Sequence, residues 1–258
     1  MSNKTVLCII DDNRDEKLSK MFLNSIRKFH DEEELPVKII KREDYTEFME
    51  DPHFYYRAKC LIAKRFIDEY DTVIVADADQ IMTGDISHIL SLEDYDIGTV
   101  MNFNKKDTEE YGVVSVFNIP PQEYLNAGFI AIRNKNTLEH WHSLCMGRFF
   151  PVLRYREQDL LNIIAHYGNY AVRVFDLYDP EYDYSALHGL ASKGWWDKIR
   201  LVADKFMLLP EDVPALLRPT EVKILHWAGG NSVKMNYKIH FNEECIKRLD
   251  YLVSGDEK

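Results

Sequence analysis

Little in the 258-residue sequence fits a fold held together by covalent bridges or cysteine-bound zinc. The chain has four cysteines, and no two of them form a C-x-x-C pair. This scattered spacing excludes a disulfide framework and a zinc knuckle. We therefore predict that all four cysteines are small buried hydrophobic residues in a reducing compartment. The predicted location is the cytoplasm.

The sequence also lacks a long apolar run. No stretch approaches the roughly 20 residues that a membrane-spanning helix needs. The first residues lead straight into a strand-like run rather than a signal peptide. No membrane span is therefore expected. Residues 254–258 are acidic rather than basic, so peripheral attachment to a membrane is not predicted either.

Positive charge and glycine-rich phosphate loops are scarce as well. Lys and Arg number 32 against 43 Asp and Glu, which gives a net charge of −11. Because nucleic-acid phosphates repel such a surface, a nucleic-acid partner is not expected. Neither G-x-x-x-x-G-K-[ST] nor G-x-G-x-x-G occurs, so P-loop and dinucleotide chemistry lack support. The overall composition is typical of a globular protein, with 46% hydrophobic residues available for a core.

Short apolar runs alternate with helical periodicity along the chain. Strands are predicted at 6–10, 36–40 and 72–76, with helices at 18–29 and 55–67 between them. This order is typical of parallel crossovers in an α/β fold. Further elements are expected as strands at 96–101, 128–132, 171–175 and 222–225, as helices at 136–146, 157–167 and 241–253, and as an extended loop at 177–192. We predict one domain, with a mixed sheet and helices on both faces.

Two carboxylates directly follow the third predicted strand, in Asp77-Ala78-Asp79. In an open α/β sheet, ligands bind beyond the carboxyl ends of the strands. Two aspartates separated by one residue can hold a hard divalent cation and leave positions for phosphate oxygens. A solvated turn is an equally good interpretation of this motif taken alone. The neighbouring residues decide between the two.

Residues 71–86 resemble the D-x-D segment of glycosyltransferase family 8, whose members have the Rossmann-like GT-A fold with the D-x-D after a central strand. Four further elements resemble that family and occur in its order: IDDN at 10–13, YLNAG at 124–128, EQDLLN at 157–162 and HWAG at 226–229. The resemblance extends over residues 6–229. It implies a nucleotide-binding half at about 1–103 and a sugar and acceptor half at about 104–258.

The resemblance implies a metal-dependent retaining glycosyltransferase that uses a nucleotide sugar, with a UDP-hexose as the favoured donor. Asp77, Asp79 and His226 would bind Mn²⁺ or Mg²⁺, and the imidazole favours Mn²⁺. Asp11 would accept the uracil N3–H, although an aspartate could also bind another base that carries a ring N–H. The residues implied to contact the nucleotide sugar are Asp11, Asn13, Arg57, Lys64, Asp77, Ala78, Asn102, Gly229 and Lys234. Those implied to lie at the transferred sugar are Asn126, Glu157, Gln158 and Asp159.

The sequence departs from the family pattern at three places. The lysine that follows the late glycine is missing from its usual position, and Lys234 is the nearest candidate to replace it. The basic residue of the helix before the D-x-D falls at Cys60, with Arg57 and Lys64 one turn to either side. Asn102 stands where the family more often has an aspartate that contacts the sugar. These changes leave the identity of the donor sugar open.

Two rival interpretations also remain open. A nucleotidyltransferase shares the α/β layout and the acidic metal site, but it usually has a glycine-rich basic loop where residues 11–16 are acidic. A non-catalytic nucleotide-binding scaffold with the GT-A fold is favoured by the displaced lysine and opposed by the intact acidic, amide and histidine residues. The acceptor is expected to be a hydroxyl group of a glycan, a protein or a small molecule.

Overall fold

The computed structural model of the chain describes residues 4–11, 16–101, 117–119, 123–175, 184–188, 196–213, 218–227 and 237–255. Its strands are β1 Thr5–Ile10, β2 Val37–Ile40, β3 Thr72–Asp77, β4 Gln80–Met82, β5 Ile97–Met101, β6 Leu125–Ile132, β7 Val172–Val174, β8 Tyr184–His188, β9 Arg200–Val202, β10 Lys205–Leu208 and β11 Thr220–His226. The α-helices are α1 Glu16–Arg27, α2 Phe54–Phe66, α3 Ser87–Leu90, α6 Lys135–Cys145, α7 Arg156–Tyr167 and α8 Glu243–Val253. Short 3-10 helices cover Arg42–Asp44, Thr46–Phe48, Phe150–Val152, Trp196–Lys198 and Tyr237–Ile239.

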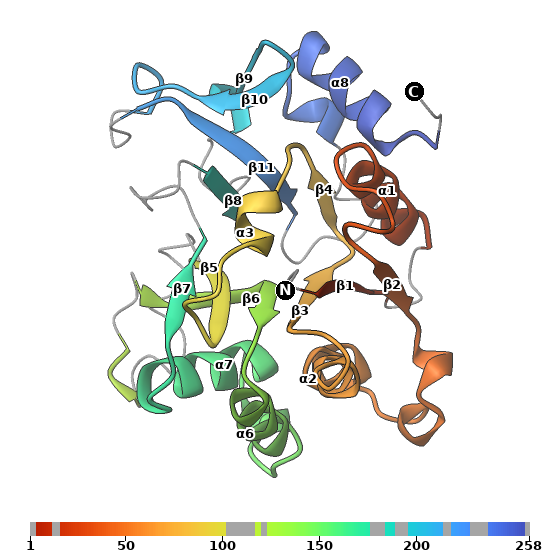
Figure 1. Cartoon of the computed structure of the whole chain (residues 1–258), viewed down its shortest axis with the longest axis vertical. Coiled ribbons are helices and arrows are strands. Elements are labelled where there is room, and N and C mark those ends of the chain that lie inside the picture. The colour runs from red at the N-terminus through yellow and green to blue at the C-terminus, as the bar shows by residue number, and fades with distance from the viewer. Residues whose placement is uncertain are drawn as a thin grey trace.

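The strands form two sheets (Figure 1). The larger has the order β2-β1-β3-β6-β5-β7. β1 is parallel to β2 and β3, whereas β6 is antiparallel to both of its neighbours. The smaller sheet has the order β4-β11-β10-β9, and β8 pairs with β11 in parallel. The predicted mixed α/β sheet is thus confirmed. Its parallel strands β2, β1 and β3 come from the β-α-β-α-β segment at the start of the chain, and β5 and β7 form a second parallel pair.

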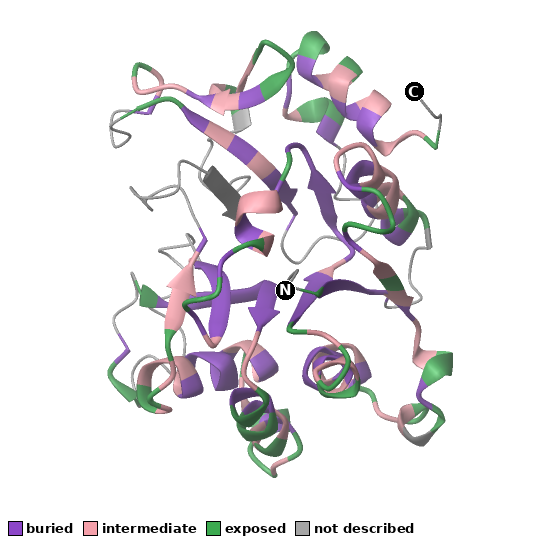
Figure 2. Ribbon diagram, in the orientation of Figure 1, coloured by how far each residue is buried: buried purple, intermediate pink, exposed green. Residues whose placement is uncertain are grey.

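Helices cover both faces of the larger sheet, which explains why its central strands are apolar on both sides. Every residue of β1 is buried (Figure 2). Leu7 and Ile9 lie in a core shared with α1, α8 and the smaller sheet, while Val6, Cys8 and Ile10 lie in a second core formed with α2, α6 and α7. Figure 1 shows these two layers on opposite sides of the sheet.

Most elements agree with the prediction. The strands and helices expected from periodicity are present, and all four cysteines are buried with free thiols. The loop expected at 177–192 is wrong where β8 forms at Tyr184–His188, and the rest of that segment lies outside the described residues. β4, β9 and β10 were not predicted, because runs of three or four residues show no clear period. None of the described helices has the length and apolar character needed to cross a bilayer.

The D-x-D segment is the junction between the two sheets. β3 ends at Asp77 in the larger sheet, and β4 begins at Gln80 in the smaller one. The ladder between β4 and β11 places Gln80 opposite His226. The backbone N–H of Trp227 donates to the carbonyl of Asp79 over 3.0 Å. The end of β11 is therefore fixed against the D-x-D by main-chain hydrogen bonds.

Candidate active site

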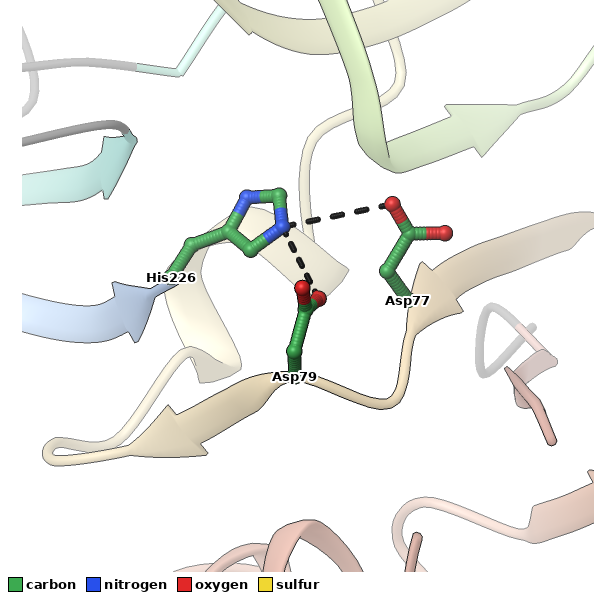
Figure 3. A group of neighbouring side chains, drawn as sticks. All are labelled: Asp77, Asp79 and His226. Atoms are coloured by element: carbon green, nitrogen blue, oxygen red, sulfur yellow. Dashed lines mark hydrogen bonds and ion pairs between the residues drawn. The ribbon is translucent and has the colours of Figure 1, made fainter. Parts of the chain in front are cut away.

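Asp77, Asp79 and His226 come together where the two sheets meet (Figure 3). His226 Nε2 lies 3.1 Å from Asp79 Oδ1 and 3.9 Å from Asp77 Oδ2. One potential ligand atom from each residue lies within 4.8 Å of the other two. The structure thus brings together the three residues that the sequence suggested as metal ligands.

The three residues fit a divalent cation. Asp79 and His226 are buried and Asp77 is half-buried. Burial raises the pKa of Asp79, and the neighbouring His226 opposes this rise only in part. A buried carboxylate with a raised pKa lacks compensating positive charge, which a bound cation would supply. Two carboxylates and one imidazole are the donor set expected for Mn²⁺ or a similar borderline ion.

Lys59 links this metal triad to the start of α7. Its ammonium lies 2.8 Å from Asp77 Oδ1 and 3.1 Å from Glu157 Oε1, and it donates to the carbonyl of Ala127 over 2.9 Å. Tyr55 also donates to Asp77 Oδ1, over 3.0 Å. Burial alone lowers the pKa of Lys59, but the two carboxylates outweigh it and leave that pKa raised. Lys59 is therefore a charged buried residue, and Asp77 turns its other oxygen, Oδ2, toward His226.

Glu157 is a buried carboxyl group beside this lysine. Burial raises the pKa of Glu157 to about 7, although the positive charge of Lys59 acts in the opposite direction. Oε1 is paired with Lys59, whereas Oε2 is buried without a hydrogen-bond partner among the described residues. The backbone carbonyl of Glu157 accepts from the indole N–H of Trp141 over 3.0 Å. The site thus holds a carboxyl group that changes charge near neutral pH.

This raised pKa predicts a pH dependence of stability. Between the ordinary value of 4.5 and about 7, the folded protein binds more protons than the unfolded chain, so the free energy of unfolding falls as pH rises. Over this window we expect the free energy of unfolding of wild type to fall by about 3 kcal/mol relative to that of Glu157→Gln. Denaturant titrations in chelator at several pH values measure the difference. Glu139→Gln, on the exposed face of α6, serves as the control, and parallel profiles for wild type and Glu157→Gln would contradict the expectation.

Asn126 and Gln158 meet across a bulge in β6. The register with β5 passes from Ile130 opposite Thr99 to Asn126 opposite Val100, so residues 127–129 bulge out of that ladder. Such bulges re-aim side chains beside active sites. Gln158 Oε1 accepts from the side-chain amide of Asn126 over 2.8 Å and from the backbone N–H of Ala127 over 2.9 Å. These bonds fix the orientation of the Gln158 carboxamide at the first turn of α7.

Gly128 lies within this bulge and directly against His226 of the metal triad. A Cβ at this position would lie 2.1 Å from Cε1 of His226 and 2.7 Å from Oδ1 of Asn126. Real side chains do not approach this closely, so only glycine allows the imidazole to occupy its observed place. Asn126 and His226 therefore flank the same residue, which brings the amide pair next to the candidate metal ligands.

We expect Gly128→Ala to displace the imidazole and to weaken divalent-cation binding by roughly 10–100-fold, as loss of support around a metal ligand commonly does. A calorimetric titration with Mn²⁺ measures this. Gly84→Ala is the matched control, because its Cβ would meet only the flexible side chains of Glu221 and Lys223. Unchanged Mn²⁺ affinity in Gly128→Ala would show that the close contact between Gly128 and His226 is not needed for cation binding.

Asp159 and Asn162 hold the start of α7 in place. The Asp159 carboxylate accepts from the hydroxyl of Tyr124 over 2.5 Å and from the backbone N–H of Tyr155 over 3.0 Å. The Asn162 side chain bonds to the N–H and the carbonyl of Leu125, at 2.7 and 2.9 Å. Asp159 is thus engaged with its own helix start and the neighbouring tyrosine, and both residues anchor α7 against β6.

The other suggested site residues fall into three groups. Asp11 is buried directly after β1, whose Ile10 pairs with Asp77, so it lies at the same sheet edge as the metal triad. Ala78 is buried within the D-x-D. Arg57 and Lys64 are not brought to the triad. Arg57 contacts Asp51 over 2.5 Å and the carbonyl of Cys145 over 3.1 Å, and Lys64 is exposed. Four suggested residues, Asn13, Asn102, Gly229 and Lys234, lie outside the described part of the chain.

Lys59 is the site residue that sequence reasoning missed. It directly precedes Cys60, where the family pattern places its basic residue, whereas Arg57 and Lys64 lie one turn to either side of that position. Lys59 shares a helical face with Ile62 and Ala63, both buried. The signal that could have identified it is a lysine on the apolar face of the helix before the D-x-D strand. A buried lysine is almost always paired with an acidic group, and the D-x-D supplies one nearby.

Comparisons with known proteins identify the family and the fold. Residues 2–185 match the family described as Glycosyl transferase family 8. The galactosyltransferase LgtC, solved with donor and acceptor sugar analogs, is 13% identical with a TM-score of 0.59, and the match covers 98% of each chain. The bifunctional glycosyltransferase WbbM is 13% identical with a TM-score of 0.57, covering 98% of this chain and 52% of WbbM. Mouse xyloside xylosyltransferase 1 is 12% identical with a TM-score of 0.51, covering 91% of this chain and 99% of the mouse protein.

The chain matches none of the curated proteins compared with it. At identities of 12–13%, the solved structures establish the fold, and they share the GT-A arrangement of a mixed sheet. The family match covers more than half of the sequence. The chain therefore belongs to glycosyl transferase family 8 and is a glycosyltransferase with the GT-A fold.

Proposed function

We propose that the protein is a metal-dependent, retaining glycosyltransferase that moves a hexose from a UDP-sugar to a hydroxyl acceptor. The observation that carries this proposal is the convergence of three potential ligand atoms within 4.8 Å, next to an oriented pair of amide side chains. A solvated turn does not account for a buried histidine held between two carboxylates.

Asp77, Asp79 and His226 would hold Mn²⁺ or Mg²⁺. When bound, the cation supplies Lewis-acid stabilisation for the negative charge that develops on the diphosphate leaving group. The protein's contribution is to fix the ligand atoms before substrate arrives. Lys59 and Tyr55 occupy Asp77 Oδ1, which favours Oδ2 as the ligand atom on the side of His226.

Asp11 supports uridine as the nucleotide. Its carboxylate follows β1 at the sheet edge that Asp77 also occupies, where bases bind in open α/β folds. A carboxylate accepts the N3–H of uracil and cannot donate to bases that present only acceptors there. UDP is therefore the proposed carrier of the sugar.

The contacts of Gln158 favour a front-face displacement over a covalent intermediate. A carboxamide is a weak nucleophile, and Gln158 Oε1 already accepts two hydrogen bonds. The backbone N–H of Ala127 fixes which end of the amide is the oxygen. The Gln158 side chain is therefore proposed to orient the sugar, while the departing phosphate takes the proton of the acceptor hydroxyl. Retention of anomeric configuration follows from attack on the face that the phosphate leaves.

Gln158→Ala tests this role. We expect the rate of sugar transfer to fall by roughly 10²-fold while UDP affinity changes less than threefold, because the side chain is proposed to act on the transferred sugar. UDP release from a panel of UDP-sugars with Mn²⁺ measures the rate, and calorimetry measures the affinity. Equal losses in both would reassign Gln158 to nucleotide binding, and no turnover by wild type with any UDP-sugar would contradict the proposed donor class.

A further inference from the structure

Exposed apolar side chains gather in the connection between α6 and α7. Met146, Phe149 and Val152 are 41%, 62% and 78% exposed, and Val152 has the highest exposure among the large hydrophobic residues that the structure describes as exposed. Eight such residues are found, and three of them fall within this stretch of seven. Single exposed hydrophobic residues are normal, whereas a cluster of them marks an interaction surface.

The local backbone aligns two of these side chains, those of Phe149 and Val152. Phe150–Val152 is a 3-10 helix, and the N–H of Val152 donates to the carbonyl of Phe149 over 3.2 Å. In this conformation residues three apart point the same way, which aligns Phe149 with Val152. Phe150, in contrast, is fully buried, and the Arg57 guanidinium lies 4.6 Å from its ring centroid. The segment is thus anchored by Phe150 and presents its other side to solvent.

The charge of this segment differs from that of the rest of the protein. Residues 140–156 contain no acidic residue, although the chain has 43 in 258 positions. The same stretch contains three arginines, and Arg148 and Arg154 are exposed. The Arg148 guanidinium lies 4.8 Å from the ring centroid of Phe149. Exposed apolar tips flanked by arginines therefore form one local surface, which we call the arginine loop (residues 146–154).

We propose that the arginine loop docks the protein on a membrane surface that contains anionic lipids. Apolar side chains that enter the acyl boundary, with arginines at the level of the headgroups, are the features of interfacial binding. Attraction of each cation to an anionic leaflet acts within a Debye length, so the acidic remainder of the chain is largely screened. The proposed attachment uses an internal segment. The expectation of no peripheral attachment rests on the acidic residues 254–258, which do not report on this segment.

The arginine loop is continuous with the candidate active site. It leads directly into α7, whose first turn carries Glu157 and Gln158. Beneath it, Phe150 packs against the guanidinium of Arg57 on α2, and Tyr55 in the same turn of that helix donates to Asp77 over 3.0 Å. Docking would therefore bring the site to the lipid surface and favour a hydroxyl acceptor carried by a membrane-anchored molecule. This consequence for the acceptor rests on the proposed function, whereas the docking itself does not.

Co-sedimentation of the full chain with vesicles tests the proposal. The vesicles contain phosphatidylcholine alone or mixed equally with phosphatidylglycerol. We expect binding to the anionic vesicles that weakens as salt is added. Phe149→Ser/Val152→Ser should reduce the bound fraction roughly tenfold, and Arg148→Gln should reduce affinity about fivefold. The matched control is Val202→Ser/Ile239→Ser, which removes apolar residues that are 46% and 71% exposed elsewhere and should leave binding unchanged.

Three outcomes would overturn the proposal: no binding to anionic vesicles, equal binding of the loop variant and the control, or equal binding to both kinds of vesicle. Sedimentation without vesicles adds a further outcome. Self-association that Phe149→Ser/Val152→Ser abolishes would identify a second copy of the chain as the occupant instead. Calorimetry with UDP and Mn²⁺ on the same variants separates the two proposals, because a failure of docking leaves nucleotide binding intact.

Discussion

Asp79→Asn is expected to lower the rate of metal-dependent sugar transfer by roughly 10³-fold or more. The substitution keeps the shape of a buried side chain whose Oδ1 lies 3.1 Å from His226 Nε2, but it removes the charge that a cation requires. Metal stabilisation of a leaving diphosphate amounts to several kcal/mol, and each 1.36 kcal/mol is a factor of ten in rate. The loss should therefore appear in turnover far more than in folding.

Initial rates of UDP release with and without Mn²⁺ measure this effect. Asp85→Asn is the control, because Asp85 is an exposed aspartate that follows β4 and faces Ser87 rather than the metal triad. Asp79→Asn should also unfold at nearly the same denaturant concentration as wild type, because burial raises the pKa of this carboxyl and so disfavours its charged form. Retained turnover in Asp79→Asn would exclude it from the metal site.

Lys59→Met is expected to destabilise the metal-free protein by about 3–5 kcal/mol. The lysine is 3% exposed and lies within 3.1 Å of the carboxylates of Asp77 and Glu157. Removing one partner of a buried ion pair leaves uncompensated charge, which costs far more than the pair itself contributes. Methionine keeps the length of the side chain, so the effect comes mainly from charge.

A double substitution separates charge from packing. Lys59→Met/Glu157→Gln should recover part of the lost free energy of unfolding, because it removes one of the two orphaned carboxylates. Lys64→Met, on the exposed side of the same helix, should change stability by less than about 0.5 kcal/mol. Denaturant titration in chelator measures all three variants. A loss below about 1 kcal/mol for Lys59→Met, or no recovery in the double variant, would contradict the bridging role of Lys59.

The parts of the site that lie at the ends of regular strands could be predicted from the sequence. Asp77 follows an apolar run that reads as a strand buried on both faces, and the structure places it at the end of β3. The late apolar run before His226 likewise becomes β11. In both cases a local pattern fixes the element, and the rule that ligands bind at strand ends places the side chain.

Features decided by contacts between distant segments could not be predicted in the same way. Which side of α2 faces Asp77 depends on the rotation of that helix against the sheet. The sequence does not specify this rotation, so it suggested Arg57 and Lys64 rather than Lys59. The strand predicted at 128–132 begins at Leu125, because the three residues before Gly128 show no strand period. Strand β8 forms through its ladder with β11 rather than through its own sequence pattern.

The most direct test of the central claim is a calorimetric titration of UDP into the full chain, with Mn²⁺ and again with a chelator. The proposed site predicts a Kd in the micromolar range with Mn²⁺, little or no binding with chelator, and loss of the Mn²⁺-dependent binding in Asp79→Asn. UDP binding of equal strength in chelator, or none in either condition, would contradict a metal-dependent UDP-sugar site at Asp77, Asp79 and His226.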